Sequence, residues 1–402
     1  MDFVSPSRNI RHSYDFERAR ISAVIPTFKP GNLTAALIVN LIEWHRNIHV
    51  YVVDDCTPLT DEGYVAIFKR MGSISNRASV LRTPQNSLKA GALNFALSHI
   101  YKEQKHQPDV ILSLDDDIVI TPDTIPNLVT ELMSTDSFGA VCSQCRVLNK
   151  NKNILTRLQG LEYLGFNATR LADEGFYLGP LVMHGMLTAF RTEALREVGG
   201  FCEGHLIEDY EITARLKAKG WCVKAALNAP AWTIVPETFP KLWRQRTRWS
   251  YGGITVITKT KHRLAVLQDL IGHGIFLTTL LVICLLVVLS GSGRISPLVA
   301  YWIITLSFLQ LTLWYVFQLW LMRLYKDKDI YDWFVRICLL PEFVYGNLMT
   351  IVVVGSYLFF MYNFISRIVL KHGGKVAEKI IEVGKRLFRM FGYTEGWGTR
   401  TH

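Results

Sequence analysis

The first half of the chain alternates short apolar runs with longer segments in which apolar residues recur at helical spacing. Runs typical of β-strands lie at residues 21–28, 49–55, 79–83, 109–117 and 140–145. Between them, segments such as LTAALIVNLIEW, KAGALNFALSHI and TIPNLVTELM carry apolar residues every three or four positions. This alternation predicts an α/β fold with a mostly parallel sheet covered by helices. In open sheets of this kind, ligands bind at the carboxyl ends of the strands.

Three long apolar stretches follow in the second half. Residues 272–291, 297–322 and 343–366 contain no Asp, Glu, Lys or Arg. A bilayer core of about 30 Å needs about 20 apolar residues as a helix, so each stretch is long enough to span it. The first 260 residues contain no such run, and the polar start of the chain lacks a signal-peptide core. We therefore expect a soluble domain first and a membrane region after it.

The distribution of positive charge predicts the side of the membrane on which the soluble parts lie. Arg323, Lys326 and Lys328 follow the second apolar stretch, whereas only Arg294 follows the first. Residues 366–392 carry seven basic residues against two acidic ones, in a chain of net charge +10. The positive-inside bias places the soluble domain, this loop and the tail together on the cytosolic face. Three full crossings would put the tail outside, so either the last apolar region includes an in-plane or re-entrant piece or the bias misleads here.

Seven cysteines without a repeated spacing do not suggest a disulfide framework. Cys142 and Cys145 form a CxxC motif, but no second Cys or His pair follows at the spacing of a zinc finger. We interpret both as buried strand residues rather than metal ligands. The soluble part is therefore predicted to be cytosolic and reduced.

Acidic residues end two of the predicted strands. Asp54 and Asp55 end one, and Asp115, Asp116 and Asp117 end another. An extended backbone would direct Asp115 and Asp117 to the same side, where two carboxylates and substrate phosphates could hold a hard divalent ion. A solvated loop in which an aspartate caps the next helix is the alternative. Neither GxGxxG nor GxxxxGK[ST] occurs, which argues against a dinucleotide enzyme and a P-loop ATPase.

Two further segments place charged groups at predicted helix starts. Lys89 opens one helix, where an amine and free backbone N–H groups favour an anion, although it could be an ordinary surface lysine. Glu208 and Asp209 open another helix. Asp209 could be only an N-cap, or it could take the proton from an attacking sugar hydroxyl.

The segment QRTRW combines cations with an indole ring directly before the first apolar stretch. Gln245 and Trp249 are four residues apart on one predicted helical face, and Arg248 lies beside them. A stacking ring and an amide suit a sugar acceptor, and a guanidinium can bind a diphosphate. Simple anchoring at lipid headgroups is the alternative.

Taken in order, these motifs resemble those of the inverting family 2 glycosyltransferases, specifically the membrane-integrated processive synthases of hyaluronan, chitin and cellulose. That family carries an Asp, a DxD, an acidic–Asp pair and QxxRW, which match Asp55, Asp115 with Asp117, Asp209, and residues 245–249. The resemblance covers about residues 21–253 and also includes KAGALN and REVGGF. It implies a Rossmann-like GT-A fold, a UDP-sugar donor and Mg²⁺ or Mn²⁺.

The resemblance also implies a role for each matched residue. Asp209 would be the general base, and Asp117 with Asp115 would hold the metal. The residues expected to bind the nucleotide sugar are Thr27, Asp54, Asp55, Lys89, Asp115, Arg248, Trp397 and Arg400. The residues expected to bind the acceptor are Glu208, Gln245 and Trp249.

Near the end of the chain, GWGTR (residues 396–400) resembles the gating loop of hyaluronan and chitin synthases, although it could be a terminal segment without function. The preceding residues have the pattern of an in-plane amphipathic helix. Two departures concern the first strand, which ends PTFKPG, and HGMLTAFR, in which His184 is expected to be a packed loop histidine rather than an acceptor contact. These departures leave the sugar and the chain length open.

The expected organisation has five parts: a polar N-terminal segment (1–20), a cytosolic GT-A domain (21–235), interfacial helices with QRTRW (236–264), a transmembrane region (265–370) and a basic amphipathic tail with WGTR (371–402). The leading hypothesis is a multi-pass cell-membrane enzyme that transfers sugar from a UDP-sugar to a growing polysaccharide and exports the polymer. The alternatives are transfer of one sugar to a polyprenyl phosphate, and a channel or transport subunit with an inactive transferase-like domain. Expected partners are donor, acceptor and bilayer, with a membrane subunit as a further candidate and no nucleic acid.

Overall fold

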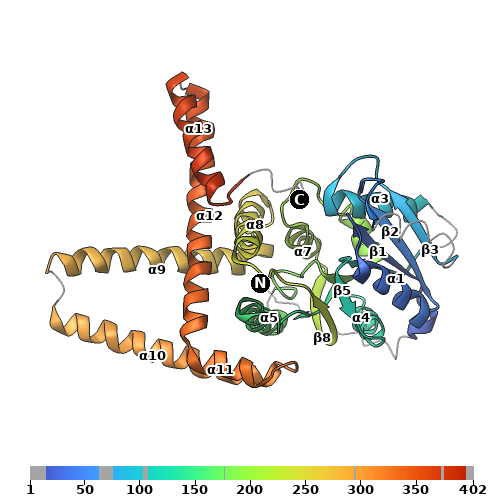
Figure 1. The fold of residues 1–402 in the computed structure, drawn as a ribbon, viewed down its shortest axis with the longest axis horizontal. Coiled ribbons are helices and arrows are strands. Elements are labelled where there is room, and N and C mark those ends of the chain that lie inside the picture. The colour runs from blue at the N-terminus through green and yellow to red at the C-terminus, as the bar shows by residue number, and fades with distance from the viewer. Residues whose placement is uncertain are drawn as a thin grey trace.

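The computed structural model describes residues 15–62, 76–102, 107–175, 177–293, 296–372 and 375–394, and these contain one sheet of eight strands (Figure 1). The strands are β1 (Ile21–Thr27), β2 (Ile48–Asp54), β3 (Ala78–Arg82), β4 (Val110–Leu114), β5 (Ile118–Ile120), β6 (Phe138–Val147), β7 (Leu187–Arg191) and β8 (Cys222–Thr233). Their order across the sheet is β3-β2-β1-β4-β7-β6-β8-β5. We call residues 21–235 the sheet domain.

The two halves of the sheet differ in strand direction. From β3 to β4 all neighbours are parallel, and the expectation of a parallel sheet is right for them. The other half makes the sheet mostly rather than wholly parallel, because β7 runs antiparallel to both β4 and β6, and β5 runs antiparallel to β8. Only β6 and β8 are parallel there. The direction of β7 depends on where it enters the sheet, which the local pattern of apolar residues does not encode.

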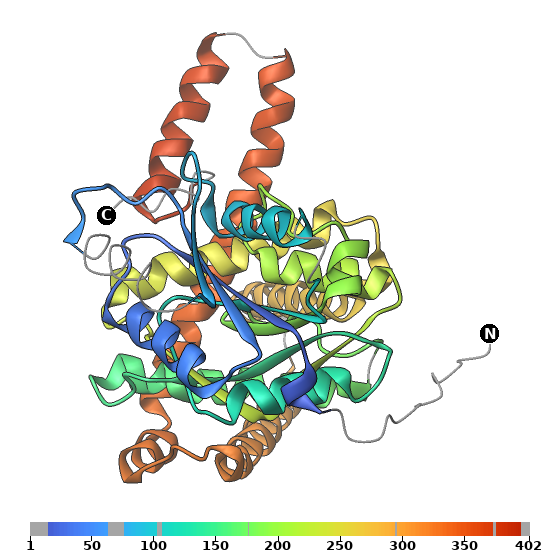
Figure 2. The same cartoon turned by 90° about the vertical axis from the view of Figure 1, so that its right-hand side faces the viewer.

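Helices cover both faces of the sheet (Figure 2). The helices α1 (Asn32–Trp44) and α4 (Thr124–Met133) pack on one face, and α3 (Leu88–Lys102), α6 (Thr192–Glu197) and α7 (Glu208–Ala218) pack on the other. Successive strand residues alternate between the two cores, so that Ala23 and Ile25 join the first and Val24 joins the second. Burial on both faces explains why these strands are almost wholly apolar.

The cysteines lie where the sequence predicted. Cys142 and Cys145 are buried in β6, with 0% and 4% of their surface exposed, and all seven cysteines are free thiols. This confirms their interpretation as core residues.

A helical region follows the sheet domain. It comprises α8 (Phe239–Lys259), α9 (Leu267–Gly291), α10 (Pro297–Leu321), α11 (Ile330–Cys338), α12 (Leu340–His372) and α13 (Lys375–Met390). Three described helices, within residues 263–290, 297–324 and 340–370, are long and apolar enough to cross a membrane. In Figure 1, α9 leads away from the sheet domain and α10 leads back, whereas α12 runs crosswise to both.

Buried ion pairs fix the start of α11 to α5 (Ile154–Ala172) and the loop before it. Lys150 Nζ lies 2.7 Å from Asp332 and 3.2 Å from Asp329, and Arg157 Nη1 lies 2.6 Å from each carboxylate. Asp329 also caps α11 by accepting from the backbone N–H groups of Tyr331 and Asp332. Because Asp332 is fully buried, both cations are needed to offset its lost hydration.

Candidate functional site

The carboxyl ends of β1, β2 and β4 bring several predicted residues to one edge of the sheet. Thr27 and Asp54 end β1 and β2 in register. Thr27 Oγ1 donates a hydrogen bond to Asp116 Oδ2, which links β1 to the turn after β4. Parallel strands end at the same edge, which is where such folds bind ligands.

Asp54 and Asp55 order the loops around this edge. Asp54 is 1% exposed, pairs with Arg82 and accepts from the Thr57 backbone N–H at 3.0 Å. Asp55 Oδ1 accepts from Thr83 Oγ1 at 2.9 Å and from the Ser87 N–H at 2.7 Å. Their contact with a nucleotide remains a prediction, and burial favours an indirect role for Asp54 through the loops that it holds.

Three loops at this edge contain non-glycine residues with left-handed backbone. Lys29 (φ 54°) follows β1, Cys56 (φ 63°) follows β2, and Leu88 (φ 61°) opens α3. Such conformations cost about 1–3 kcal/mol each and gather at ligand sites. The strain at Leu88 lies directly before Lys89.

Lys89 joins residues that are far apart in the sequence. Its Nζ lies 2.6 Å from Asp115 Oδ1 and 3.3 Å from Glu208 Oε1, and it donates to the Gly185 carbonyl at 2.7 Å. Burial alone would lower the pKa of Lys89, but Asp115 and Glu208 hold it above its ordinary value. Lys89 is therefore a fixed positive charge and not the surface lysine that the sequence left open.

Asp209 faces the same cluster from the start of α7. Its Oδ2 accepts from the Gly185 N–H and its Oδ1 from the Tyr210 N–H, each at 2.8 Å. Burial and the neighbouring Glu208 raise the pKa of Asp209 to about 6, although Lys89 lowers it. The N-cap of α7 is Ile207, so the interpretation of Asp209 as an N-cap is wrong.

One cavity lies at Lys89 and Asp209, and a second lies at Asp116 and Asp117. The first is lined mainly by α3, β4, β7 and α7, and its polar lining residues are Lys89, Ser113, Thr188, Glu208 and Asp209. The second lies between the loop after β1 and the turn after β4, and its lining includes Phe28, Asn32, Asp116 and Asp117. The predicted base therefore lines one cavity and the predicted metal ligand Asp117 lines the other.

The DxD segment is a turn, contrary to the extended backbone that the sequence analysis assumed. It lies between β4 and β5, which pair with different neighbours and so force the chain to turn. Asp115 Oδ1 faces Lys89, and Asp117 Oδ1 accepts from Thr233 Oγ1 at 3.5 Å. Carboxylate oxygens fit a hard divalent cation, whose other ligands would come from a diphosphate and water.

QRTRW lies on α8, and Arg246 is the arginine of this motif that is buried. Arg246 is 5% exposed, forms an ion pair with Glu162 and stacks on Trp249 with its Cζ 4.2 Å from the ring centroid. It also donates to Gln245 Oε1. Arg248 is exposed to solvent. Glu162 lies 84 positions earlier in the chain, so no local signal could have shown the pairing.

A glycine holds α8 against the loop that leads to Asp209. A Cβ at Gly252 would lie 3.3 Å from Leu206 Cβ and 2.9 Å from Ile207 Cγ1, and the second distance is closer than real side chains pack. One turn of α8 before this contact stands Trp249. The indole is therefore on the helix that borders the Glu208–Asp209 segment.

His184 is a packed loop histidine, as expected. Its Nε2 lies within hydrogen-bond distance of the Ser143 carbonyl. Burial and the nearby Arg170 lower the pKa of His184 to about 3, so the ring is neutral.

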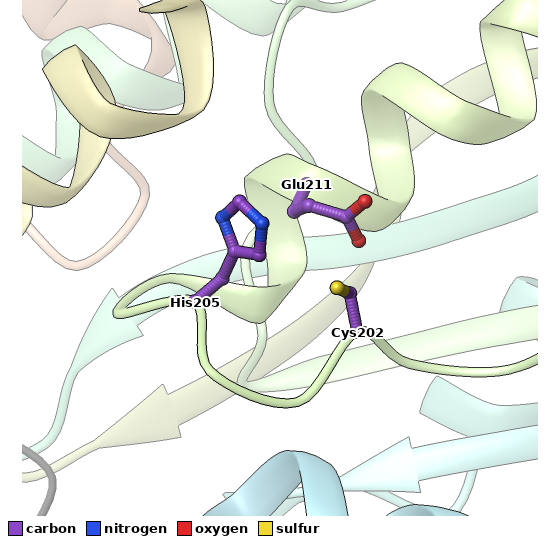
Figure 3. A group of neighbouring side chains, drawn as sticks. All are labelled: Cys202, His205 and Glu211. Atoms are coloured by element: carbon purple, nitrogen blue, oxygen red, sulfur yellow. The ribbon is translucent and has the colours of Figure 1, made fainter. Parts of the chain in front are cut away.

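A cluster of Cys202, His205 and Glu211 was not predicted from the sequence. Their potential metal-ligand atoms lie within 4.8 Å of one another (Figure 3). The spacing CxxH followed by an acid could have revealed it. However, Arg215 Nε and Nη2 bind the two oxygens of Glu211 at 2.6 and 2.7 Å. A guanidinium already neutralises this carboxylate, so the cluster is not a persuasive cation site.

The other predicted site residues are Trp397 and Arg400. Both lie outside the described residues.

Comparison with known proteins identifies relatives that match part of the chain. It is 28% identical over 175 residues to the poly-beta-1,6-N-acetyl-D-glucosamine synthase of Staphylococcus aureus, covering 44% of this chain and 41% of that protein. It is 28% identical over 256 residues to the probable glycosyltransferase YdaM of Bacillus subtilis, covering 60% and 57%. The chain therefore spans about two fifths to three fifths of the length of these relatives.

A solved structure shares the fold. The mannosyltransferase PcManGT from Pyrobaculum calidifontis, determined with GDP-Man and Mn²⁺, has a TM-score of 0.53 at 19% identity, covering 78% of this chain and 88% of that one. The sheet domain thus has the GT-A-type fold that the motifs implied. Residues 110–324, more than half of the 402, match the family described as glycosyl transferase family group 2. The chain belongs to that family.

Proposed function

We propose that this protein transfers N-acetylglucosamine from its UDP derivative to a growing polysaccharide at the membrane. The observation that carries the proposal is the convergence of Lys89, Asp115, Glu208 and Asp209 around Gly185, linked by contacts of 2.6 to 3.3 Å. The name of the Staphylococcus aureus relative supports N-acetylglucosamine as the sugar and a polymeric product.

In the proposed reaction an acceptor hydroxyl attacks the anomeric carbon of the donor sugar. The new bond forms from the hydroxyl oxygen while the bond from the anomeric carbon to the diphosphate oxygen breaks, so UDP leaves and the configuration inverts. The hydroxyl proton passes to Asp209. With a pKa of about 6, Asp209 is ionised at neutral pH and more basic than an ordinary aspartate, which suits a general base.

Asp115 and Asp117 are the proposed ligands of a divalent metal, Mg²⁺ or Mn²⁺. When bound, the metal would supply Lewis-acid stabilisation of the departing diphosphate. The structure of the mannosyltransferase with the same fold contained Mn²⁺, which is consistent with this assignment. Lys89 adds a fixed positive charge beside Asp115.

The acceptor would lie near α8, with Trp249 as its stacking surface. We retain residues 21–235 as the catalytic unit on the cytosolic face, and residues 236–264 as the interface with the membrane. Arg248 is exposed and available to a diphosphate or a lipid headgroup. The role of Trp397 and Arg400 in closing over the donor remains a prediction.

The test is turnover by purified protein in nanodiscs with radiolabelled UDP-N-acetylglucosamine and Mn²⁺. We expect a high-mass product that β-hexosaminidase degrades. Asp209→Asn should abolish transfer but keep UDP binding measured by calorimetry, whereas Glu193→Gln on the exposed surface of α6 should behave as wild type. A chloroform-soluble product would contradict polymer synthesis, and undiminished transfer by Asp209→Asn would exclude it as the base.

A further inference from the structure

The end of the described chain returns to α8. Trp243 Nε1, on α8, donates to the Phe391 carbonyl at 2.7 Å. Tyr251 on α8 packs against Phe359, and Phe359 packs against Tyr393, with ring centroids 4.9 and 5.8 Å apart. Because α8 directly follows the sheet domain, residues 391–393 lie on the same side of any bilayer as that domain. The chain between α8 and Phe391 must therefore cross an even number of times.

The helices α9 and α10 form one such pair of crossings. At the start of α9, Asp269 accepts from Tyr210 Oη of α7 at 2.7 Å. Just after α10, Asp327 pairs with Arg146 at 3.1 Å and accepts from Trp232 Nε1 at 3.1 Å. The apolar window of each helix is 0% buried between these ends. Both inner ends are thus tied to the sheet domain, which leaves α12 as the unpaired apolar helix.

The helix α12 contacts the rest of the protein near both of its ends, which a helix that crosses the bilayer could not do. Tyr345 Oη donates to Glu162 of α5 at 2.8 Å, and Asn363 Nδ2 donates to Tyr251 of α8 at 3.0 Å. The 18 residues from 345 to 363 correspond to about 27 Å of helix, close to the thickness of a hydrocarbon core. If α12 crossed the bilayer, α5 and α8 would have to enter it with charged side chains such as Arg246, which lipid strongly disfavours.

The two faces of α12 differ in what covers them. Val352, Ser356, Phe359 and Asn363 point inward and are at most 7% exposed. A second set, spaced seven residues apart on another face, is apolar and 49 to 56% exposed within the described structure. It consists of Val344, Ile351, Leu358 and Ile365.

The helix α13, which follows α12, also has an exposed apolar face. Ile380, Val383, Leu387 and Met390 recur at helical spacing and are 54 to 82% exposed. Arg386, on another part of the helix surface, is also exposed. An exposed apolar face flanked by basic residues is the composition of a helix that lies in the interface of a bilayer.

We propose that α12 and α13 lie along the membrane surface beneath the sheet domain, with their exposed apolar faces in lipid, and that only α9 and α10 cross among the helices that the structure describes. The mean hydropathy of α12 is that of a spanning helix, but its inner face packs against the protein and not against lipid. With two crossings, the basic tail lies on the same side of the membrane as the sheet domain, as the positive-inside bias predicts. Three crossings would place it on the opposite side. The inference deepens the proposed membrane placement, and its tests need no turnover, so it can fail while the proposed glycosyl transfer stands.

The first test measures depth along α12 by nitroxide labels on single cysteines at Val344, Ile351, Leu358 and Ile365, in a cysteine-free variant in liposomes. An in-plane helix places all four at one shallow depth. A crossing helix changes depth by about 10 Å every seven residues. As a control, labels at Ile271 and Val282 of α9 should differ in depth. A depth profile along α12 like that of α9 would overturn the proposal.

The second test measures sidedness with a membrane-impermeant thiol reagent on intact cells. Ser292→Cys, at the outer end of α9, should be labelled. Arg386→Cys on α13 and Lys219→Cys in the sheet domain should react only after permeabilisation. Labelling of Arg386→Cys together with Ser292→Cys would mean a third crossing. If removal of the native cysteines prevents folding, C-terminal fusions of the native chain to a fluorescent protein and to alkaline phosphatase give the same distinction.

Discussion

Replacing Glu208 with glutamine tests the electrostatics that set the proton affinity of Asp209. The pKa of Asp209 is raised to about 6, first by burial and then by the charge of Glu208, while Lys89 lowers it. Glutamine keeps the shape of Glu208 and removes its charge, and Lys89 remains nearby. A charge within about 4–6 Å shifts a carboxyl pKa by about 1–3 units, so we expect the pKa of Asp209 to fall by about one unit.

The change should appear in the acid limb of the pH profile. A general base works when it is deprotonated, so activity rises with pH through the pKa of Asp209. At pH 5, a pKa of about 6 leaves roughly one base in eleven ionised, and a pKa of about 5 leaves one in two. Relative to its own neutral-pH plateau, kcat/KM of Glu208→Gln at pH 5 should therefore be about fivefold greater than that of wild type.

Normalising each enzyme to its plateau separates this shift from any loss of acceptor binding. Glu203→Gln is the matched control, because Glu203 accepts a hydrogen bond from Asn94 that glutamine can also accept, and it does not contribute to the shift of Asp209. Its acid limb should stay near pH 6. Superimposable profiles for wild type and Glu208→Gln would refute the coupling, and a wild-type limb near pH 4 would refute the raised pKa.

Three other substitutions probe the metal, the acceptor and the fold. Asp117→Ala should weaken Mn²⁺-dependent UDP binding at least about tenfold in calorimetry and leave metal-free binding unchanged. Trp249→Ala should reduce polymer formation about tenfold, the equivalent of roughly 1.4 kcal/mol of aromatic contact, while hydrolysis of the donor changes little. Asp332→Asn should destabilise the protein by about 3–5 kcal/mol, because it leaves Lys150 and Arg157 short of a buried partner. Thermal unfolding in detergent should show a much smaller loss for Asp327→Asn, whose side chain is 29% exposed.

Much of this site could be predicted from the sequence, because residues that follow neighbouring parallel strands meet at one edge of the sheet. Asp55 and Asp115 follow strands whose apolar runs are unambiguous, and β1 lies between those strands. What the sequence could not show was the second half of the sheet. β8 contains Pro230 and pairs with β6 through a register shift near Gln144, and a proline within a run argues against a strand.

Two other features could not be predicted from the sequence pattern: ion pairs between distant residues, and the orientation of α12 relative to the membrane. The ion pair of Arg246 with Glu162 could not be predicted, because Glu162 is distant in sequence and spacing alone does not show which arginine faces the protein. Hydropathy marks α12 as a span because it counts apolar residues without regard to what they contact. Ser356 and Asn363 are seven apart on α12 and are at most 7% exposed, so these two polar residues lie on the face that packs on protein.

If α9 and α10 are the only described helices that cross the membrane, they cannot form a path for the polymer by themselves. A pair of helices has a single line of contact and cannot surround a polar chain, and lipid cannot satisfy the hydroxyl groups of a sugar. The apolar windows of α9 and α10 are 0% buried and are therefore open to further helices as well as to lipid. Export would then need crossing helices in addition to the two that the described residues provide, whereas transfer would not. A nanodisc holding one copy should accordingly make polymer but leave it accessible to hydrolase on the side where the donor was added.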